Sequence, residues 1–251
     1  MKRLTVLSIT LVLACSVYAQ KEGTITYTQI MQMDFKAPEG MEEMFKNMPK
    51  ENSSKKELLF SNDKSIYQNP DDKIGNEDNQ INLGDEEMTF QIHFDEPDEK
   101  LFIDLKSKQS VHQQEFMGKK FLVEGEQRMI DWKLGKDKKR IADFICMEAK
   151  TTVHDTIPIT AWFTPQIPIS IGPNGYGGLP GMILQIDRDN GRQVITAKTI
   201  DFKAPNIELI VAPKNGKKIN KEEYDKIVEE KMVEMKAQHS GSGSTIIEIK
   251  N

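Results

Sequence analysis

Cysteine and aromatic residues are scarce in this chain of 251 residues. There are two cysteines, Cys15 and Cys146, and aromatic residues make up 7% of the sequence. Cys15 lies in an N-terminal segment that we expect to be removed, so a single thiol would remain and no internal disulfide could form. Because free cysteine is among the most buried residue types, we interpret Cys146 as a small buried hydrophobic residue. The low aromatic content favours a single sheet with one well-buried face over two thick cores.

The chain also lacks an excess of basic residues and the short motifs of common enzymes. Its formal net charge is −5, whereas nucleic-acid binding needs concentrated lysine and arginine, so the composition argues against a nucleic-acid partner. The sequence contains no zinc-protease, nucleophile-elbow or phosphate-loop motif. The four histidines are scattered without the short spacing of metal ligands. We therefore predict a protein that is not an enzyme, with no cofactor and no catalytic residues.

Residues 1–19 have the pattern of a secretory signal peptide. Lys2 and Arg3 precede an apolar run that is shorter than the about 20 residues needed to span a bilayer. The tripeptide that ends at Ala19 is typical of a signal-peptidase site, which predicts cleavage there and export of the chain. The alternative is a lipoprotein signal with Cys15 as the lipidated residue. Only in that case do we expect association with a membrane.

Residues 20–251 are predicted to form a single, mainly β domain. Short runs of β-branched and aromatic residues alternate with turn signals, a pattern typical of one curved antiparallel sheet or a partly open barrel. The Asn190-Gly191 pair is the clearest hairpin signal, because it readily takes the positive φ values of a type I′ turn. The predicted strands are 23–35, 55–67, 88–94, 100–105, 110–116, 120–123, 127–133, 140–151, 182–188 and 193–202. A solvated, lysine-rich turn is expected at 135–137, between the strands 127–133 and 140–151.

Helices are expected near the two ends of this sheet. In the N-terminal half, a short helix is predicted by apolar residues at helical spacing, namely Met41, Met44, Phe45 and Met48. An amphipathic helix is predicted at about 220–238, with Asn220 as its N-cap. Its apolar face would consist of Tyr224, Ile227, Val228, Met232 and Met235. A C-terminal tail, 241–251, follows a Gly-Ser joint and contains a candidate edge strand at 245–249.

The segment 165–181, which we call the clasp, is rich in proline and glycine. Proline lacks an amide proton and biases the residue before it toward extended geometry, so the clasp is not expected to be a central strand. Ile167, Ile169 and Ile171 alternate with other residues, and we expect them to lie together on the sheet. The clasp should then end in a type II turn, with Pro180 at the second position and Gly181 at the third.

The clasp and its flanks resemble the signature of the GLPGLI family. The six-residue motif corresponds to residues 178–183, with Met182 in place of the usual leucine. Residues 161–173 resemble the segment that precedes the motif, and 141–149 resemble an upstream strand that carries a cysteine. The resemblance implies an exported protein of a bacterium with an outer membrane, located in the periplasm or at the outer-membrane periphery, with no defined catalytic residues. We expect a structural role for Trp162, Pro165, Pro168, Gly172, Pro173, Gly178, Leu179, Pro180 and Gly181.

Two functions remain open at this level. The first is a non-catalytic binding or scaffold module that takes an apolar ligand or an envelope protein partner in the concave face of the sheet, with the clasp beside the groove. The second is binding of Cu(I), which soft thioether sulfur favours. Its ligands would be Met31, Met33, Met41, Met44 and Met48. Core packing accounts for the same residues, because methionine fills irregular gaps.

Overall fold

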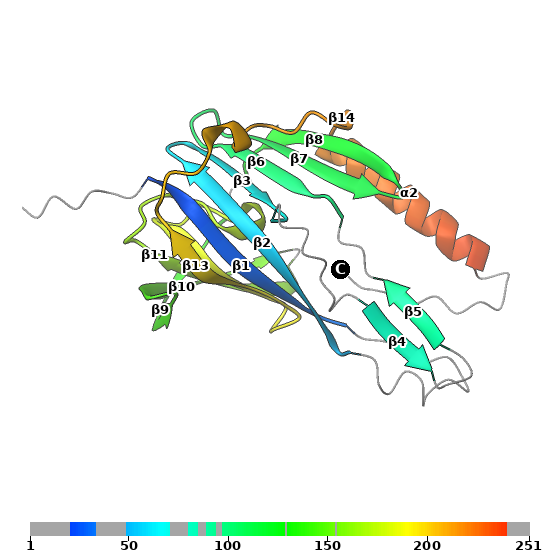
Figure 1. Ribbon diagram of the computed structural model, residues 1–251, viewed down its shortest axis with the longest axis horizontal. Helices are drawn as coiled ribbons and strands as arrows, with labels where there is room; N and C mark the ends of the chain where they lie inside the picture. The colour runs from blue at the N-terminus through cyan, green and yellow to red at the C-terminus, as the bar shows by residue number, and fades with distance from the viewer. Residues whose placement is uncertain are drawn as a thin grey trace, which may run out of the picture.

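The computed structural model describes residues 21–33, 49–70, 80–84, 89–93, 97–128, 130–153 and 155–239. Within these ranges the chain is mainly β, as predicted, with one large curved sheet that is not closed into a barrel (Figure 1). The signal peptide, the predicted helix at 41–48 and the candidate strand at 245–249 all lie outside the described residues. No helix in the described part combines the length and apolar character that crossing a bilayer requires.

Twelve strands form the large sheet, in the order β14-β8-β7-β6-β3-β2-β1-β13-β12-β11-β10-β9. Neighbours are antiparallel except for β14 and β8, which run parallel. The strands are β1 (Glu22–Gln32), β2 (Glu51–Ser61), β3 (Lys64–Gln68), β6 (Lys100–Asp104), β7 (Gln109–Phe116), β8 (Lys119–Glu126), β9 (Lys133–Ile141), β10 (Phe144–Val153), β11 (Ile157–Thr164), β12 (Met182–Arg188), β13 (Gln193–Asp201) and β14 (Lys217–Asn220). A separate hairpin pairs β4 (Gln80–Gly84) with β5 (Thr89–His93).

The turns at two positions differ in detail from the prediction. The single strand expected at 55–67 is a hairpin of β2 and β3, because Asn62 takes φ 53 and turns the chain. Asparagine tolerates this left-handed conformation better than most residues. The hairpin between β12 and β13 is confirmed, although its loop has positive φ at three successive residues, Asp189 to Gly191, where a type I′ turn has two.

The prediction for residues 127–140 is wrong. Residues 127, 128 and 130–132 form no strand, and the turn expected at 135–137 lies inside β9. The chain turns instead at Ala142 and Asp143, both with positive φ. The lysines of β9 suggested a solvated turn, but β9 is the last strand of the sheet and most of its side chains are exposed. Charged residues on an edge strand are common, since they discourage pairing with other chains.

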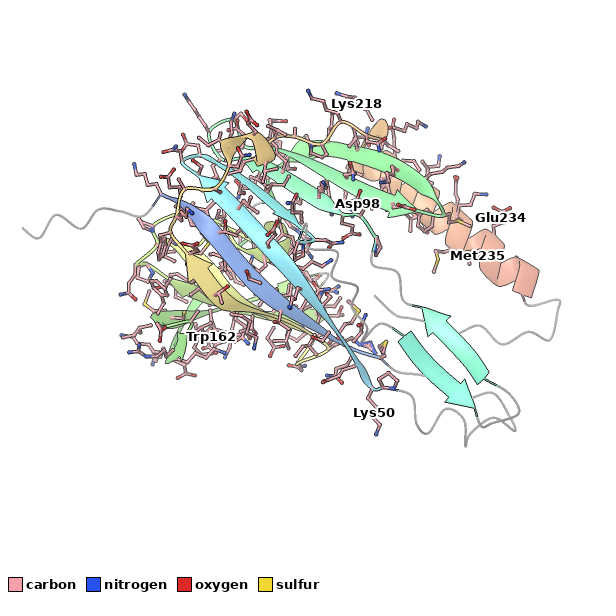
Figure 2. The ribbon with its side chains drawn as sticks, viewed as in Figure 1. Lys50, Asp98, Trp162, Lys218, Glu234 and Met235 are labelled. Carbon is pink, nitrogen blue, oxygen red and sulfur yellow. The ribbon has the colours of Figure 1, made fainter. Side chains whose placement is uncertain are left out.

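Both halves of the sheet contribute to one main core. Strands β1 and β2 cross the middle of the large sheet. On one side of them lie β3, β6, β7, β8 and β14, and on the other lie β13, β12, β11, β10 and β9 (Figure 1). Leu58 and Phe60 of β2 share a buried cluster with Cys146 of β10 and Leu184 of β12. The two ends of the sheet are far apart: Trp162 lies on the β9–β12 side and Lys218 on β14 (Figure 2).

The clasp packs into this core through its isoleucines, as predicted. Ile167, Ile169 and Ile171 belong to the main cluster and are at most 7% exposed. Further along, Tyr176 and Leu179 are buried in a second cluster that includes Phe163, Ile183 and Ile186. The clasp therefore fills space that an apolar ligand was predicted to occupy along the sheet.

The turn at the end of the clasp is not type II. A type II turn is usually closed by the amide of its fourth residue, but the Met182 N–H donates instead to the Ile167 carbonyl oxygen at 2.9 Å. The Gly181 N–H donates to the Leu179 carbonyl oxygen at 2.8 Å, which closes a tighter turn around Pro180. Gly181 takes φ 150. The hydrogen bond between the first residue of β12 and the clasp thus replaces the one that would close a type II turn.

The C-terminal helix α2 spans Lys221–His239 and begins as predicted. The Asn220 side-chain oxygen accepts a hydrogen bond of 2.9 Å from the Glu223 N–H, so Asn220 is the N-cap. Tyr224 and Ile227 pack against the buried cluster of β8 and β14. Farther along, Met232 and Met235 are exposed, and Figure 2 shows Met235 beyond the ends of the strands. Among the described residues, packing of the predicted apolar face against the sheet is therefore shown for Tyr224 and Ile227.

Candidate functional site

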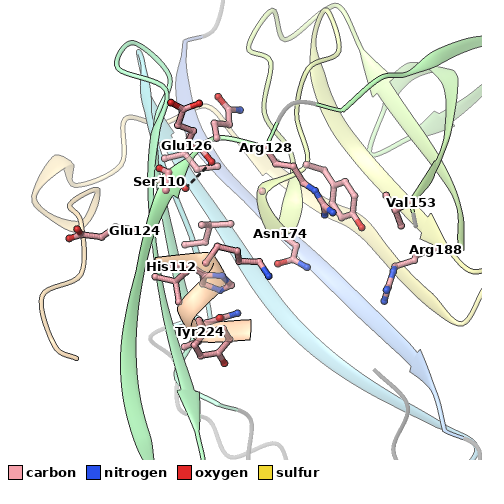
Figure 3. Close-up of a pocket in the computed structure, with 18 of the residues that line it drawn as sticks. Ser110, His112, Glu124, Glu126, Arg128, Val153, Asn174, Arg188 and Tyr224 are labelled. Atoms are coloured by element: carbon pink, nitrogen blue, oxygen red, sulfur yellow. Dashed lines mark hydrogen bonds between the residues drawn. The ribbon is translucent and has the colours of Figure 1, made fainter. Parts of the chain in front are cut away.

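A cavity of about 630 Å³ opens between the two halves of the folded sheet (Figure 3). One wall is formed by β6, β7 and β8 together with the start of α2. The opposite wall is formed by the short 3-10 helix η2 (Pro173–Gly175) of the clasp and by the ends of β10, β12 and β13. The lining residues that carry the argument below are Leu101, His112, Val123, Arg128, Asn174, Tyr176, Arg188 and Gln193.

The sheet wall combines an apolar floor with a row of polar side chains. Alternate residues of a strand point to the same face, so Ser110, His112 and Gln114 of β7 all face the cavity. His112 is paired in register with Leu101 of β6 and with Val123 of β8. The middle of this wall is therefore a polar stripe between two apolar strands.

His112 is uncharged near neutral pH. Burial lowers the pKa of its imidazole to about 4, and the positive charge of Lys221 acts in the same direction. Lys221 itself forms an ion pair with Asp225 one helical turn further along α2. A histidine with this pKa is a weak general base near pH 7, because catalysis is best served by a pKa close to the working pH.

The clasp wall is held close to the sheet by glycine. Asn174 and Gly175 take φ 49 and φ 76, which turns the chain sharply after Pro173. A Cβ atom on Gly175 would lie 2.8 Å from Cδ2 of Leu101, so glycine, which also suits the positive φ, favours this approach to β6. The close contact closes the floor of the cavity, and Asn174 stands between the two walls in Figure 3.

Two arginines border the cavity on the side of the clasp. Arg188 is the last residue of β12 and is half-buried, whereas Arg128 follows β8 and is exposed. Burial raises the pKa of the Tyr176 hydroxyl, and the positive charges of Arg188 and Arg128 both act against that rise. Both guanidinium groups are therefore close enough to act on the same hydroxyl. No ion pair within the described ranges involves either of them.

Of the two acidic residues that line the rim, Glu124 and Glu126, the first has an ion-pair partner outside the cavity. Glu124 points away from the cavity in Figure 3 and pairs with Lys218 at 2.7 Å. The Ser110 hydroxyl donates to the backbone carbonyl oxygens of Gly125 and Glu126 at 3.3 and 3.4 Å, which fixes it against the sheet. The cavity thus has a positive end near the clasp and a largely neutral, partly apolar end near α2.

None of the nine residues to which the sequence analysis gave a structural role lines this cavity. Leu179, Gly181, Gly172 and Pro173 are buried, whereas Pro165, Pro168, Gly178 and Pro180 are exposed. Trp162 is half-buried on β11, and the Lys139 ammonium group lies 4.1 Å from the centre of its ring. Of the clasp, Asn174, Gly175 and Tyr176 border the cavity. The sequence signal that was missed is the polar alternation at Ser110, His112 and Gln114.

The predicted thiol and methionine positions have different outcomes. Cys146 is fully buried, as predicted, and burial raises the pKa of its thiol to about 11. Met31 and Met33 are half-buried at the end of β1. Met41, Met44 and Met48 lie outside the described residues. Among the residues that the structure describes, His, Cys, Asp and Glu form no group of three or more that could hold a metal ion.

Comparisons with known proteins give a short family match and a similarity of fold. A family model described as a protein of unknown function (Porph_ging) matches residues 150–185, which run from β10 through β11 and the clasp into β12. The match agrees with a family of undefined activity, and the resemblance to the GLPGLI family remains a prediction. No curated protein matches the chain.

Among solved structures, the chain is similar to PNGF-II in two crystal forms. The sequence identities are 16% and 17%, both with a TM-score of 0.52. Each match covers 82% of this chain and 32% of the other, so the chain corresponds to about a third of the length of PNGF-II. At this identity the similarity concerns the fold alone.

Proposed function

We propose that this protein is an exported, non-catalytic binding protein whose ligand occupies the cavity between β6–β8 and η2. The observation that carries the proposal is the cavity itself, at about 630 Å³. This volume lies within the roughly 300–1,000 Å³ typical of small-molecule sites. Its walls come from a rigid sheet and from a clasp that is packed into the core, so the site is formed before a ligand arrives.

The chemistry of the nearby groups supports binding without catalysis. The Cys146 thiol has a pKa of about 11 and is fully buried. A thiol is a nucleophile only as the thiolate, which is rare at such a pKa. His112 has a pKa of about 4 because of burial and the charge of Lys221. Neither group is suited to nucleophilic or general-base chemistry near neutral pH.

The packing restricts where an apolar part of the ligand can lie. Much of the space between the two halves of the sheet is filled by the main core and by the isoleucines of the clasp. Leu101, Ile103 and Val123 remain at the cavity wall. We therefore place the apolar part of the ligand against these three side chains, rather than along the whole concave face.

Export is part of the same proposal and rests on the pattern of residues 1–19. N-terminal sequencing of protein recovered from the periplasmic fraction would test it. We expect Gln20 to be the first residue of the mature chain. A mature chain that begins with a lipidated Cys15 would replace soluble export by attachment to a membrane.

A cavity-filling substitution tests the binding proposal. Gln114 faces the cavity, whereas Glu115, the next residue of β7, faces the other side of the sheet. We expect the parent protein to bind the neutral apolar dye Nile red saturably, Gln114→Trp to lose most of that binding, and Glu115→Trp to retain it. No saturable binding by the parent, or equal binding by the two variants, would leave only a scaffold role.

A further inference from the structure

We infer that the cavity takes an amphiphile whose acidic head group, a carboxylate or phosphate, lies between Arg128 and Arg188 and whose apolar tail lies toward Val123. This inference rests on the proposed function and adds the chemical class of the ligand. It requires that the two arginines have positive charge to spare, that neutral hydrogen-bond donors stand beside them, and that the opposite end of the cavity is uncharged. The structure meets each requirement in turn.

No ion pair within the described residues occupies the Arg188 guanidinium group, and the acidic residues beside it in the sequence have other partners. The Asp187 carboxylate accepts a hydrogen bond of 2.7 Å from the Gly191 N–H in the β12–β13 turn. The Asp189 carboxylate lies 3.8 Å from the guanidinium group of Arg192. Arg188 itself is paired in register with Ile159 and Gln193, so its backbone is fixed between two strands. The structure thus holds a half-buried guanidinium group at the cavity wall.

Arg128 adds a second positive charge at the same end. It lies in the segment that leads from β8 toward β9, and Figure 3 shows its side chain extending toward the clasp wall. In the same view Glu126 lies on the other side of the rim. The guanidinium group is planar and donates two parallel hydrogen bonds to a carboxylate or phosphate. Two arginines can therefore bind one acidic group together.

Neutral donors surround the two arginines. Asn174 takes φ 49 at the sharp turn of η2 and stands between the cavity walls. Tyr176 retains its proton at neutral pH, since burial raises the pKa of its hydroxyl. Gln193, the first residue of β13, also lines the cavity. Together these side chains offer amide and hydroxyl donors to the remaining lone pairs of an anion.

Among the described residues that line the opposite end of the cavity, none offers an unpaired charge to a second polar group. His112 is neutral near pH 7, and Lys221 is paired with Asp225. Beside them Val123 and the ring of Tyr224 belong to the cluster that joins β8 to α2. This gradient, positive at the clasp and apolar at the helix, orients an amphiphile with its tail toward α2.

Competition against Nile red with ligands of one chain length tests the inference. We expect dodecanoate to bind about tenfold more tightly than dodecanol, since charge-assisted hydrogen bonds of this kind correspond to about a factor of ten in dissociation constant. Dodecyltrimethylammonium should bind most weakly. Dodecyl phosphate, compared with dodecanoate, distinguishes the two acidic head groups. Binding of either acid more tightly than dodecanol supports the inference.

Variants assign this preference to the two arginines. Arg188→Ala should remove most of the advantage of dodecanoate over dodecanol, and Arg128→Ala a smaller part because its side chain is exposed. Arg140→Ala is the matched control, because Arg140 lies on β9 and donates to the Asp143 carbonyl oxygen. Unchanged dodecanol binding by each variant shows that the cavity has remained folded. Should Arg188→Ala fail to fold, Arg188→Gln gives the same comparison with a side chain of similar reach.

The outcomes separate this inference from the proposed function. If dodecanol binds as tightly as dodecanoate, or if the arginine variants keep the full preference for dodecanoate, the inference of an acidic head group is wrong. The proposal that the cavity binds a ligand is then unaffected. If Nile red and all four amphiphiles fail to bind the parent saturably, the proposed function itself is wrong.

Discussion

The hydroxyl of Tyr27 donates a hydrogen bond of 2.8 Å to the carbonyl oxygen of Ile183, 156 positions further along the chain. Tyr27 lies in β1, in the middle of the sheet, and Ile183 lies in β12, directly after the clasp. Both side chains are fully buried. The bond therefore ties the first strand to the point at which the clasp leads back into the sheet.

Removal of this hydroxyl should weaken the fold without disturbing its packing. Tyr27→Phe keeps the ring, which lies 6.2 Å from the ring of Tyr67, but leaves the Ile183 carbonyl without this donor. Because an unsatisfied buried polar group costs about 1–3 kcal/mol, the free energy of unfolding measured in urea should fall by that amount. A variant as stable as the parent would show that the bond contributes nothing.

Gly181 should be among the least replaceable residues of the clasp. A Cβ atom at this position would lie 2.2 Å from the Thr164 carbonyl oxygen, and φ is 150. Strain and overpacking together predict that Gly181→Ala lowers the free energy of unfolding by about 2–6 kcal/mol.

Gly191→Ala is the matched control for this substitution. Gly191 also has positive φ, at 92, but has open space around its Cα atom. Gly191→Ala should therefore lower the free energy of unfolding by about 1 kcal/mol, which is the cost of a side chain on a left-handed backbone. Equal losses from the two variants would contradict the steric account of the clasp.

Signals that act over a few residues made much of the fold predictable from the sequence. The Asn190-Gly191 hairpin, the Asn220 cap and the buried isoleucines of the clasp depend on local backbone preference or on simple alternation. The errors arose where tertiary context decides. Met182 satisfies its amide with the distant Ile167, and the lysines of β9 are tolerated because that strand ends the sheet.

The pKa of His112 makes stability depend on pH. Above about pH 6.5 the imidazole is neutral in both the folded and the unfolded chain. Between that value and the folded pKa of about 4, only the unfolded chain binds the proton, so the free energy of unfolding decreases as the pH falls. The decrease should reach at most about 3 kcal/mol by pH 4. Below pH 4 this contribution is constant.

Comparison of the parent with His112→Gln isolates this effect, since the other titrating groups are common to both proteins. Denaturation in urea between pH 7 and pH 4.5 should show a smaller loss of stability in the variant. The range stays above the region in which Asp98 and Asp104 titrate, whose pKa values are lowered by hydrogen bonds from Lys120 and from the Ser107 backbone. Parallel pH profiles would rule out His112 as the source.

Cys146 should be inert in the folded protein. Its side chain is fully buried, and with a pKa of about 11 only about one thiol in ten thousand is ionised at pH 7. A thiol reagent should therefore label Cys146 only after the protein is unfolded, and Cys146→Ala provides the baseline. Complete labelling under native conditions would contradict both the burial and the packing of β10.

The candidate site was less predictable than the fold, for a physical reason. Its two walls come from residues that lie far apart in the sequence, and no local rule brings Val123 near Asn174. The arginines at 128 and 188 become a pair only once β8 and β12 have been placed on opposite sides of the folded sheet. The proline and glycine pattern predicted the segment that forms one wall of the cavity, because these residues restrict the backbone locally. It did not predict which side chains line the cavity.

The most direct test of the binding account is a crystal structure with dodecanoate brominated at its terminal carbon. The anomalous signal of bromine locates the tail independently of how the rest of the density is interpreted. We expect a bromine peak inside the cavity beside Val123, with the carboxylate between Arg188 and Arg128. A peak only on the outer surface of the sheet, or an unchanged cavity at saturating ligand, would contradict the account.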